Sequence, residues 1–160
     1  MHVLIIDDEA AIRQVMSAAV SRAGHSVDTA ANVKEASAKL VRGDVDVALC
    51  DIRMPDGDGV ELVRSFLGSG IDTHFIMVTA FASVETAVEA LRAGASDYIV
   101  KPVSPPIVRA RVRTHLSLVK ASQLEKSYHD AIFMLGEASE LKDADTGAHI
   151  WRMAGYSSAL

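Results

Sequence analysis

Short apolar runs alternate with segments of helical spacing along residues 1–119 of the chain. The runs are bounded by polar and turn residues and are too short for helices, which is typical of strands buried in a parallel sheet. They cover residues 3–6, 27–30, 47–50, 75–78 and 98–100. The second run is the weakest, because Asp28 and Thr29 interrupt it. The pattern predicts an α/β domain with five parallel strands.

The segments between the runs repeat apolar residues at intervals of three or four positions, which predicts amphipathic helices. Asn32 and Ser83 each precede such a segment and have side chains suited to an N-cap. Pro105 suits the first turn of a fifth helix. The predicted helices cover residues 10–22, 33–42 and 57–67, the segment between Ser83 and Gly94, and a segment from Pro105 onward. Each apolar run is therefore followed by a helix.

No glycine, proline or loop cluster interrupts residues 107–135, so the fifth helix is predicted to continue as a linker over residues 120–142. Its apolar residues follow a 3-4-3-4-3 spacing, which is expected of a short coiled coil. An amphipathic helix lying on its own domain is the alternative. The stripe consists of Ala121, Leu124, Tyr128, Ala131, Leu135 and Ala138. A polar, glycine-containing segment at 143–147 is predicted to end the helix.

The composition is that of an ordinary globular protein, since 49% of the 160 residues are hydrophobic and 23% are charged. The net charge of -5 disfavours a nucleic-acid surface, so no DNA partner is expected. No apolar run approaches the roughly 20 residues of a membrane span. Met1 and His2 lead directly into the first strand, which argues against a signal peptide. Cys50 lies in an apolar run and is predicted to be a buried, unreactive thiol. Together, these features favour a cytoplasmic location.

Polar side chains follow four of the apolar runs. Because the carboxyl ends of parallel strands form the ligand crevice of such sheets, these side chains are expected to meet at one edge. They are Asp7 and Asp8 after the first strand, Asp51 after the third, Thr79 after the fourth and Lys101 after the fifth. Carboxylates, a hydroxyl and an ammonium suit a divalent cation together with a phosphoryl group.

The acidic residues have the chemistry of a magnesium site. Mg²⁺ prefers oxygen ligands and keeps several waters, and Mn²⁺ is the alternative ion. Asp8 and Asp51 can supply two carboxylates, and Asp7 can hold a metal-bound water. The backbone carbonyl of Arg53 can reach the same ion. For the acids before the first helix alone, a solvated turn is the competing interpretation, since acids favour helix N-termini.

Asp51 is the candidate nucleophile, because a carboxylate can attack phosphorus to form an acyl phosphate. Such a transfer needs charge neutralisation more than acid–base help. Lys101 and Thr79 are expected to bind phosphoryl oxygens, and the small Ala80 leaves the approach open. A cis bond before Pro102 would aim Lys101 at the site.

Four motifs stand in order along these strand ends. They are Ile5-Ile6-Asp7-Asp8-Glu9, Asp51-Ile52-Arg53-Met54-Pro55-Asp56-Gly57-Asp58-Gly59, Val78-Thr79-Ala80 and Asp97-Tyr98-Ile99-Val100-Lys101-Pro102. Together they resemble the receiver domain of bacterial two-component response regulators, over residues 1–119. The resemblance implies a flavodoxin-like, doubly wound (βα)5 sheet with an extended C-terminal helix. It also implies that Asp51 accepts a phosphoryl group from a histidine kinase and that Lys101 anchors that group.

The same resemblance implies that Thr79 and Tyr98 form a switch pair. On phosphorylation Thr79 moves toward the phosphoryl group, and the Tyr98 ring swings into the space that it leaves. This movement remodels the face formed by the fourth helix, the fifth strand and the fifth helix. A homodimer is expected through this face, through the linker helix or through both. A half-buried strand tyrosine is the competing interpretation of Tyr98.

A further motif occupies residues 140–153, after the linker. It resembles the opening of an HD-GYP phosphodiesterase domain, a family that cleaves cyclic di-GMP at a site of two or three metals. Asp145 and His149 match an acid–histidine pair of that family, and their spacing places both on one helix face. The resemblance implies that residues 143–160 begin such an output domain. Its other metal-binding motifs do not follow within the chain, so no phosphodiesterase activity is expected here.

Two other functions fit parts of the pattern. A magnesium-dependent phosphatase of the haloacid dehalogenase kind would also use Asp51, but its leaving-group acid would stand where this chain has Arg53. A dimerisation scaffold with a degenerate receiver would depend on the linker stripe instead. The acids at Asp56 and Asp58 suggest calcium, but further ligands are not found at the required spacing.

Overall fold

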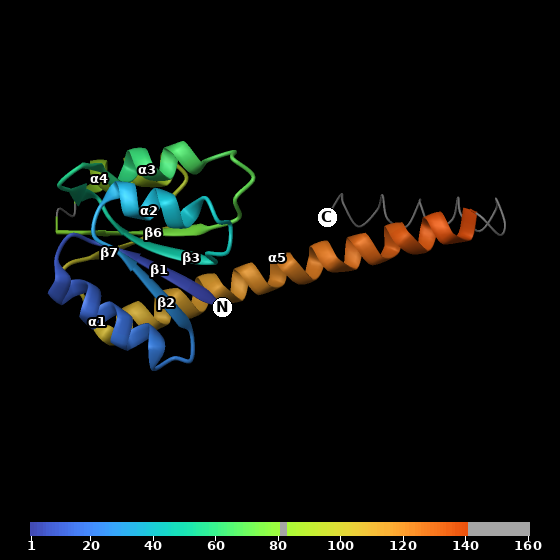
Figure 1. Ribbon diagram of the computed structural model, residues 1–160, viewed down its shortest axis with the longest axis horizontal. Coiled ribbons are helices and arrows are strands. Elements are labelled where there is room, and N and C mark those ends of the chain that lie inside the picture. The colour runs from blue at the N-terminus through green and yellow to red at the C-terminus, as the bar shows by residue number, and fades with distance from the viewer. Residues whose placement is uncertain (81–82, 141–160) are drawn as a thin grey trace. The chain divides into compact units, whose positions relative to one another are not determined.

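Five parallel strands form the main sheet of the computed structural model, which describes residues 1–80 and 83–140, with side chains to residue 135. Their order across the sheet is β2-β1-β3-β6-β7 (Figure 1). They are β1 (His2–Ile6), β2 (Ser26–Ala30), β3 (Val47–Asp51), β6 (His74–Thr79) and β7 (Asp97–Val100). The strand order reverses between β1 and β3, and in such sheets a ligand crevice forms at the carboxyl ends there. The predicted five-stranded, doubly wound α/β fold is confirmed.

The described helices lie between and after these strands, and two of them have the predicted N-caps. Asn32 Oδ1 accepts a hydrogen bond from the Glu35 amide at 2.8 Å. Ser83 Oγ accepts one from the Thr86 amide at 3.1 Å. The helices are α1 (Ala10–Ser21), α2 (Val33–Leu40), α3 (Gly59–Phe66), α4 (Val84–Arg92) and α5 (Pro105–Glu140). Both caps satisfy amide groups that the first turn of a helix leaves without partners.

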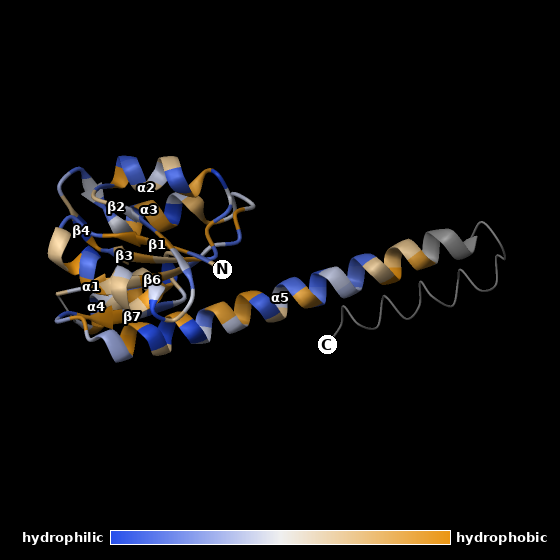
Figure 2. Cartoon of the chain, turned by 60° about the horizontal axis from the view of Figure 1, so that its bottom comes forward, coloured by the Kyte–Doolittle hydropathy of each residue, from blue (hydrophilic) through white to orange (hydrophobic). Residues whose placement is uncertain are grey.

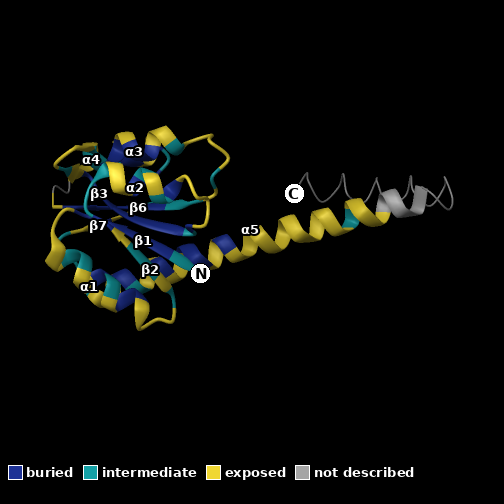
Figure 3. Cartoon of the chain, viewed as in Figure 1, coloured by how far each residue is buried: buried dark blue, intermediate teal, exposed yellow. Residues whose placement is uncertain are grey.

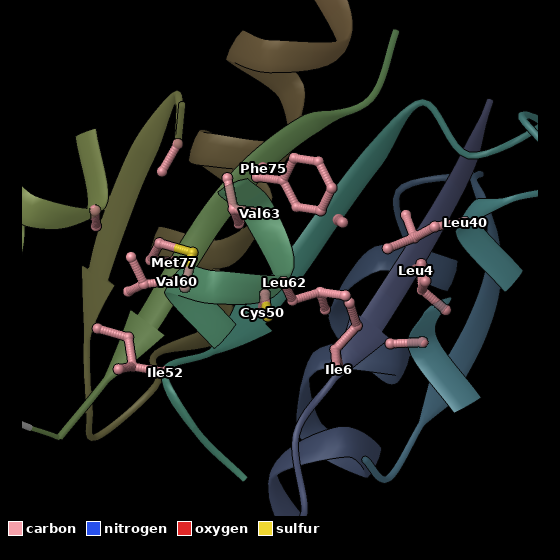
Figure 4. Packing of buried hydrophobic residues seen from close by; sticks show 14 of the residues in the cluster. Leu4, Ile6, Leu40, Cys50, Ile52, Val60, Leu62, Val63, Phe75 and Met77 are labelled. Atoms are coloured by element: carbon pink, nitrogen blue, oxygen red, sulfur yellow. The ribbon is translucent and has the colours of Figure 1, made fainter. Parts of the chain in front are cut away.

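Two apolar clusters, one on each face of the sheet, hold the unit Met1–Ser117 together. One contains buried residues of α1 and of the first turns of α5, and the other contains buried residues of α2, α3 and α4 (Figure 1). Figure 4 shows part of the second cluster, where Leu62 and Val63 of α3 lie among strand residues such as Cys50 and Met77. Alternate strand residues thus point to opposite helix layers.

The central strands are buried on both faces, which explains why their sequences are continuous apolar runs rather than alternating ones. Residues 3–6 and 47–50 have no exposed surface. These strands are orange in the hydropathy view and dark blue in the burial view, whereas the outer faces of the helices are largely exposed (Figures 2 and 3). The buried thiol of Cys50 is among these residues, as predicted.

The third helix begins two residues later than predicted, at Gly59. The two residues before it form β5 (Gly57–Asp58), which pairs antiparallel with β4 (Arg53–Met54). Asp58 Oδ1 then accepts a hydrogen bond from the Val60 amide at 2.7 Å and caps α3. The predicted start of this helix at residue 57 is therefore wrong, because Gly57 and Asp58 are paired with Arg53 and Met54 instead.

The fifth helix starts at Pro105, as predicted, and is continuous to Glu140. No break interrupts the helix over these residues, while the separate linker over 120–142 and its coiled coil stay predictions. A second unit of the chain begins at Leu118. The predicted helix end at 143–147 and the candidate ligands Asp145 and His149 lie outside the described residues. Of the helices in the described part of the chain, none combines the length and apolar character needed to cross a bilayer.

Candidate functional site

Three carboxylates from neighbouring strands converge at the carboxyl edge of the sheet. Asp7 and Asp8 directly follow β1, and Asp51 is the last residue of β3, which pairs with β1. One carboxylate oxygen of each lies within 4.8 Å of the other two, and no other such group of His, Cys, Asp or Glu was found among the described residues. Asp7 and Asp51 are buried, whereas Asp8 is exposed. The structure thus brings the three predicted metal ligands together.

Lys101 directly follows β7, an edge strand of the sheet, and its side chain reaches this cluster. Its Nζ lies 2.8 Å from Asp51 Oδ2, 2.9 Å from Asp7 Oδ2 and 3.2 Å from Glu9 Oε1. The Lys101 side chain is only 9% exposed. The peptide bond between Lys101 and Pro102 is cis, which is one of the two arrangements that the sequence left open. A fixed ammonium therefore stands beside the candidate nucleophile.

Burial and charge act in opposite directions on the ionisable groups of the site. Burial raises the pKa of Asp7 and outweighs the opposing effects of Lys101 and of the Glu9 amide. Burial works to lower the pKa of Lys101, but its contacts with Asp51 and Asp7 outweigh burial and raise it. The ammonium therefore stays charged at neutral pH, and burial makes the ionised form of Asp7 less favourable than it is in water.

The loop after Asp51 folds back on the end of β3. The Arg53 amide donates to Asp51 Oδ1 at 3.4 Å, and the Gly59 amide donates to the Ile52 carbonyl at 2.7 Å. Gly59 allows this close approach, because a β-carbon on it would overlap the carbonyl oxygen of Asp51. Arg53, whose carbonyl is a predicted ligand, is held in this loop by the pairing of β4 with β5.

The predicted switch residues occupy adjacent strands. Thr79 ends β6 and is buried, and Ala80 after it is exposed. Tyr98 on β7 is 40% exposed. Between them lies a small apolar cavity, which is lined by Ile52, Met77, Thr79, Ser83, Thr86, Ala87, Ala90 and Tyr98. The side chain of Tyr98 thus borders an inner space without filling it.

Two residues near the site were not predicted. Glu9 contacts Lys101, and its position directly after the acid pair was the available signal. Asp56 accepts hydrogen bonds from the Val33 and Lys34 amides at 2.8 and 3.0 Å, which ties the loop after Asp51 to the N-terminus of α2. These amides are 22 or more positions from Asp56 in the sequence, so no local sequence pattern predicts the contact.

The residues present fit a hard divalent cation. Asp7 Oδ2 is buried and faces Lys101, but it has no hydrogen-bond partner of good geometry among the described residues. Such an oxygen can still accept a hydrogen bond from a metal-bound water. Three carboxylates supply the oxygen ligands that Mg²⁺ prefers, and a bound cation would relieve their mutual repulsion.

A family model described as the response regulator receiver domain matches residues 3–113. Among curated proteins, the response regulator protein PilR of Pseudomonas aeruginosa is 41% identical over 115 residues, which are 72% of this chain and 26% of PilR. The transcriptional regulatory protein PhoP of Escherichia coli is 36% identical over 113 residues, which are 71% of this chain and 51% of PhoP. The chain thus spans between about a quarter and a half of the length of these relatives.

Solved structures show the same fold. A CheY-like response regulator receiver domain protein from Methanospirillum hungatei is 34% identical with a TM-score of 0.71, and the match covers 76% of this chain and 97% of that one. The BeF3-activated N-terminal receiver domain of RstA from Klebsiella pneumoniae is 27% identical with a TM-score of 0.67, covering 72% of this chain and 98% of that one.

Proposed function

Because this chain belongs to the response regulator receiver domain family, we propose that Asp51 is the residue that a histidine kinase phosphorylates. Receiver domains of two-component systems are phosphorylated by histidine kinases and bind Mg²⁺ through acidic residues. The receiver is a non-enzymatic, signal-receiving domain, so the phosphatase alternative is set aside. We assign the cation to Asp7, Asp8, Asp51 and the Arg53 carbonyl, with Mn²⁺ as the alternative ion.

The distance of 2.8 Å between Lys101 Nζ and Asp51 Oδ2 is the observation that carries this proposal. In the proposed step, an Asp51 oxygen attacks the phosphorus of a phosphohistidine. The new P–O bond forms as the P–N bond breaks, and the leaving imidazole takes up a proton. Lys101 stabilises negative charge on one phosphoryl oxygen, and Thr79 donates a hydrogen bond to another. The bound cation supplies further charge neutralisation.

The proposed switch follows from the same geometry. Thr79 turns toward the phosphoryl group, and the Tyr98 ring moves from its half-exposed position into the apolar cavity beside Thr79. Burial of an aromatic ring in an apolar space is favourable, which stabilises the phosphorylated arrangement. Ala80 keeps the approach to Asp51 open because its side chain is small, and Pro102 fixes the backbone next to Lys101.

The test is intact-mass spectrometry after incubation with acetyl phosphate and Mg²⁺. The expected result is one added phosphoryl group on the wild type and on the control Asp130→Asn, which removes an exposed carboxylate of α5. Asp51→Asn, or omission of the metal, should abolish the addition. Equal addition to wild type and Asp51→Asn would overturn the assignment of the acceptor.

We also propose that phosphorylation controls formation of a homodimer. Exposed apolar side chains of α4 and β7 line one shallow depression in the unit Met1–Ser117; they are Val84, Val88, Leu91, Tyr98 and Val100. Ile107 of α5 is also exposed. In the second unit, Leu124, Tyr128 and Leu135 of the predicted stripe are exposed as well. Sedimentation velocity with and without beryllium fluoride tests this proposal, and a monomer under both conditions would contradict it.

For the output, we propose that residues 143–160 begin an HD-GYP domain that hydrolyses cyclic di-GMP. The support comes from the sequence alone and is the spacing of Asp145 and His149. Both residues lie outside the described part of the chain. PhoP and several other relatives are named transcriptional regulatory proteins, which is a different kind of output. Metal-dependent cleavage of cyclic di-GMP by the full-length natural protein is the test, with this chain as the inactive control. Absence of cleavage by the full-length protein would exclude the proposal.

A further inference from the structure

Arg13 lies on α1, outside the acid cluster, yet it contacts the backbone that carries two of the three acids. Its Nη1 donates hydrogen bonds to the carbonyl oxygens of Asp7, at 2.7 Å, and of Asp8, at 2.9 Å. The guanidinium therefore binds the backbone carbonyls of the two consecutive residues that carry these carboxylates. Hydrogen bonds from a charged donor are about twice as strong as those between neutral groups.

Other hydrogen bonds also reach the residues on either side of Asp8, and one of them joins the Arg13 amide to the Glu9 carbonyl at 3.1 Å. The Asp7 amide donates to the Ala30 carbonyl at 3.1 Å, and the Glu9 amide donates to Asp7 Oδ1 at 2.9 Å. Glu9 is the N-cap residue of α1, but its side chain makes no capping hydrogen bond. The carboxylate of Asp8 is exposed and is a proposed metal ligand, and the hydrogen bond from Arg13 Nη1 restrains the backbone carbonyl of the same residue.

We propose that Arg13 is a positioning residue for the divalent cation: its two hydrogen bonds fix the backbone of Asp7 and Asp8 so that their carboxylates converge with Asp51. This inference rests on the proposed cation site and adds a determinant of its affinity. Residues that orient metal ligands typically contribute about 10- to 100-fold to metal affinity. We therefore expect loss of the Arg13 hydrogen bonds to weaken Mg²⁺ binding about tenfold.

Charge and geometry make opposite predictions at this position. The Arg13 guanidinium is positive, so by Coulomb repulsion alone its removal would strengthen the binding of a cation nearby. If Arg13 acts by holding the ligand backbone, its removal weakens binding instead. The sign of the change in Mg²⁺ affinity therefore separates the two effects without any assumption about their size.

The experiment is calorimetric titration of the whole chain with Mg²⁺ alone, with a melting curve in EDTA for each variant. Arg13→Met removes the charge and all donors, and Arg113→Met removes an exposed arginine of α5 as the matched control. Arg13→Met should bind Mg²⁺ about tenfold more weakly than wild type, and Arg113→Met should bind it equally well. Equal or tighter binding by folded Arg13→Met would overturn the inference. A purely structural role of Arg13 would lower the melting temperature without changing the Mg²⁺ affinity.

Two further variants complete the design. Arg13→Lys keeps the charge and a donor, so it should bind Mg²⁺ more tightly than Arg13→Met; equal or weaker binding would contradict a hydrogen-bonded role. If Arg13→Met fails to fold, Arg13→Gln replaces it. Weaker Mg²⁺ binding by Arg13→Gln than by wild type supports the inference, and equal or tighter binding overturns it. Asp8→Asn tests the cation site itself: if it binds Mg²⁺ as wild type does, the proposed site fails, whatever the Arg13 variants show.

Discussion

The backbone of Gly59 packs so closely against the carbonyl of Asp51 that a methyl group at position 59 would overlap the oxygen. Gly59→Ala should therefore displace the end of β3 and destabilise the protein by about 2 kcal/mol or more. The measurement is urea denaturation, combined with the acetyl phosphate reaction, which should slow. Gly57→Ala is the control, because its methyl group would meet only the side chain of Val33, at 3.1 Å, which can shift. Equal stability of the two variants would contradict this account.

Removal of the Lys101 ammonium should destabilise the metal-free protein. Lys101→Met leaves Asp51 and Asp7 buried without their counter-charge, and we expect a loss of about 3 kcal/mol in unfolding free energy. Mg²⁺ should recover part of this loss by replacing the missing positive charge. Urea denaturation in EDTA and in Mg²⁺ measures both effects, with the exposed Lys34→Met as control. An unchanged stability in EDTA would refute the prediction.

Asp7→Asn should have the opposite effect on the metal-free protein. Burial raises the pKa of Asp7, and Asp51 adds like-charge repulsion, so an amide at this position relieves an unfavourable ionised group. The melting temperature in EDTA should rise, and the additional stabilisation by Mg²⁺ should shrink. Scanning calorimetry of the variant and of the exposed control Asp72→Asn provides the comparison. A lower melting temperature in EDTA would show that the contact with Lys101 outweighs burial.

Thr79→Ala should separate phosphorylation from its structural consequence. The variant still has Asp51, Lys101 and the acids, so it should accept a phosphoryl group from acetyl phosphate. Without the hydroxyl, residue 79 cannot donate a hydrogen bond to the phosphoryl group, so the position of the Tyr98 ring should no longer respond to phosphorylation. The expected dimer should then not form with beryllium fluoride. Sedimentation velocity tests this, with Thr114→Ala on α5 as the control. Full dimerisation of Thr79→Ala would eliminate the proposed switch.

Stability should rise with pH across the titration of His74. Its ring lies 5.8 Å from that of His115, between centroids, and Ser96 Oγ lies 3.4 Å from its Nδ1. Burial and the neighbouring His115 lower the pKa of His74 below 6.5, and Asp72 opposes this only partly.

Because the unfolded chain then binds more protons in the window just below pH 6.5, unfolding free energy falls as pH falls through that window. Above about pH 6.5 the contribution is complete. Urea denaturation between pH 5 and 8 should show a shallower dependence for His74→Gln than for wild type. Identical pH profiles of the two proteins would rule out His74 as the cause.

The strands and the strand-end chemistry could be predicted from the sequence because both depend on local pattern. Strands buried on both faces need continuous apolar runs, and a parallel sheet brings its carboxyl ends to one edge. Asp7, Asp51 and Lys101 are therefore neighbours, although 50 residues separate Asp51 from Lys101. The caps at Asn32 and Ser83 were predictable for the same reason, since a cap acts within its own turn.

Contacts between distant segments without periodicity could not be predicted. The pairing of β4 with β5 involves two residues on each side, which is too short to show an alternation. Asp97 accepts hydrogen bonds from Arg111, at 2.8 Å, and shares one with His115, at 3.2 Å, but nothing near Asp97 in the sequence indicates these partners. The contact of Arg13 with the acid segment depends on how a guanidinium folds back over one helical turn.

The segment between α3 and β6 has exposed glycines with positive φ at Gly68 and Gly70, and no atom within 4 Å of the position where a β-carbon would stand on either. This open connection divides the proposed site by chain position: Asp7, Asp8 and Asp51 come before it, and Thr79 and Lys101 come after it. A break there would leave one fragment with the acids and the nucleophile, and another with the hydroxyl and the ammonium. Phosphorylation of Asp51 would then report on reassembly, since the proposed reaction requires both fragments to rebuild one sheet.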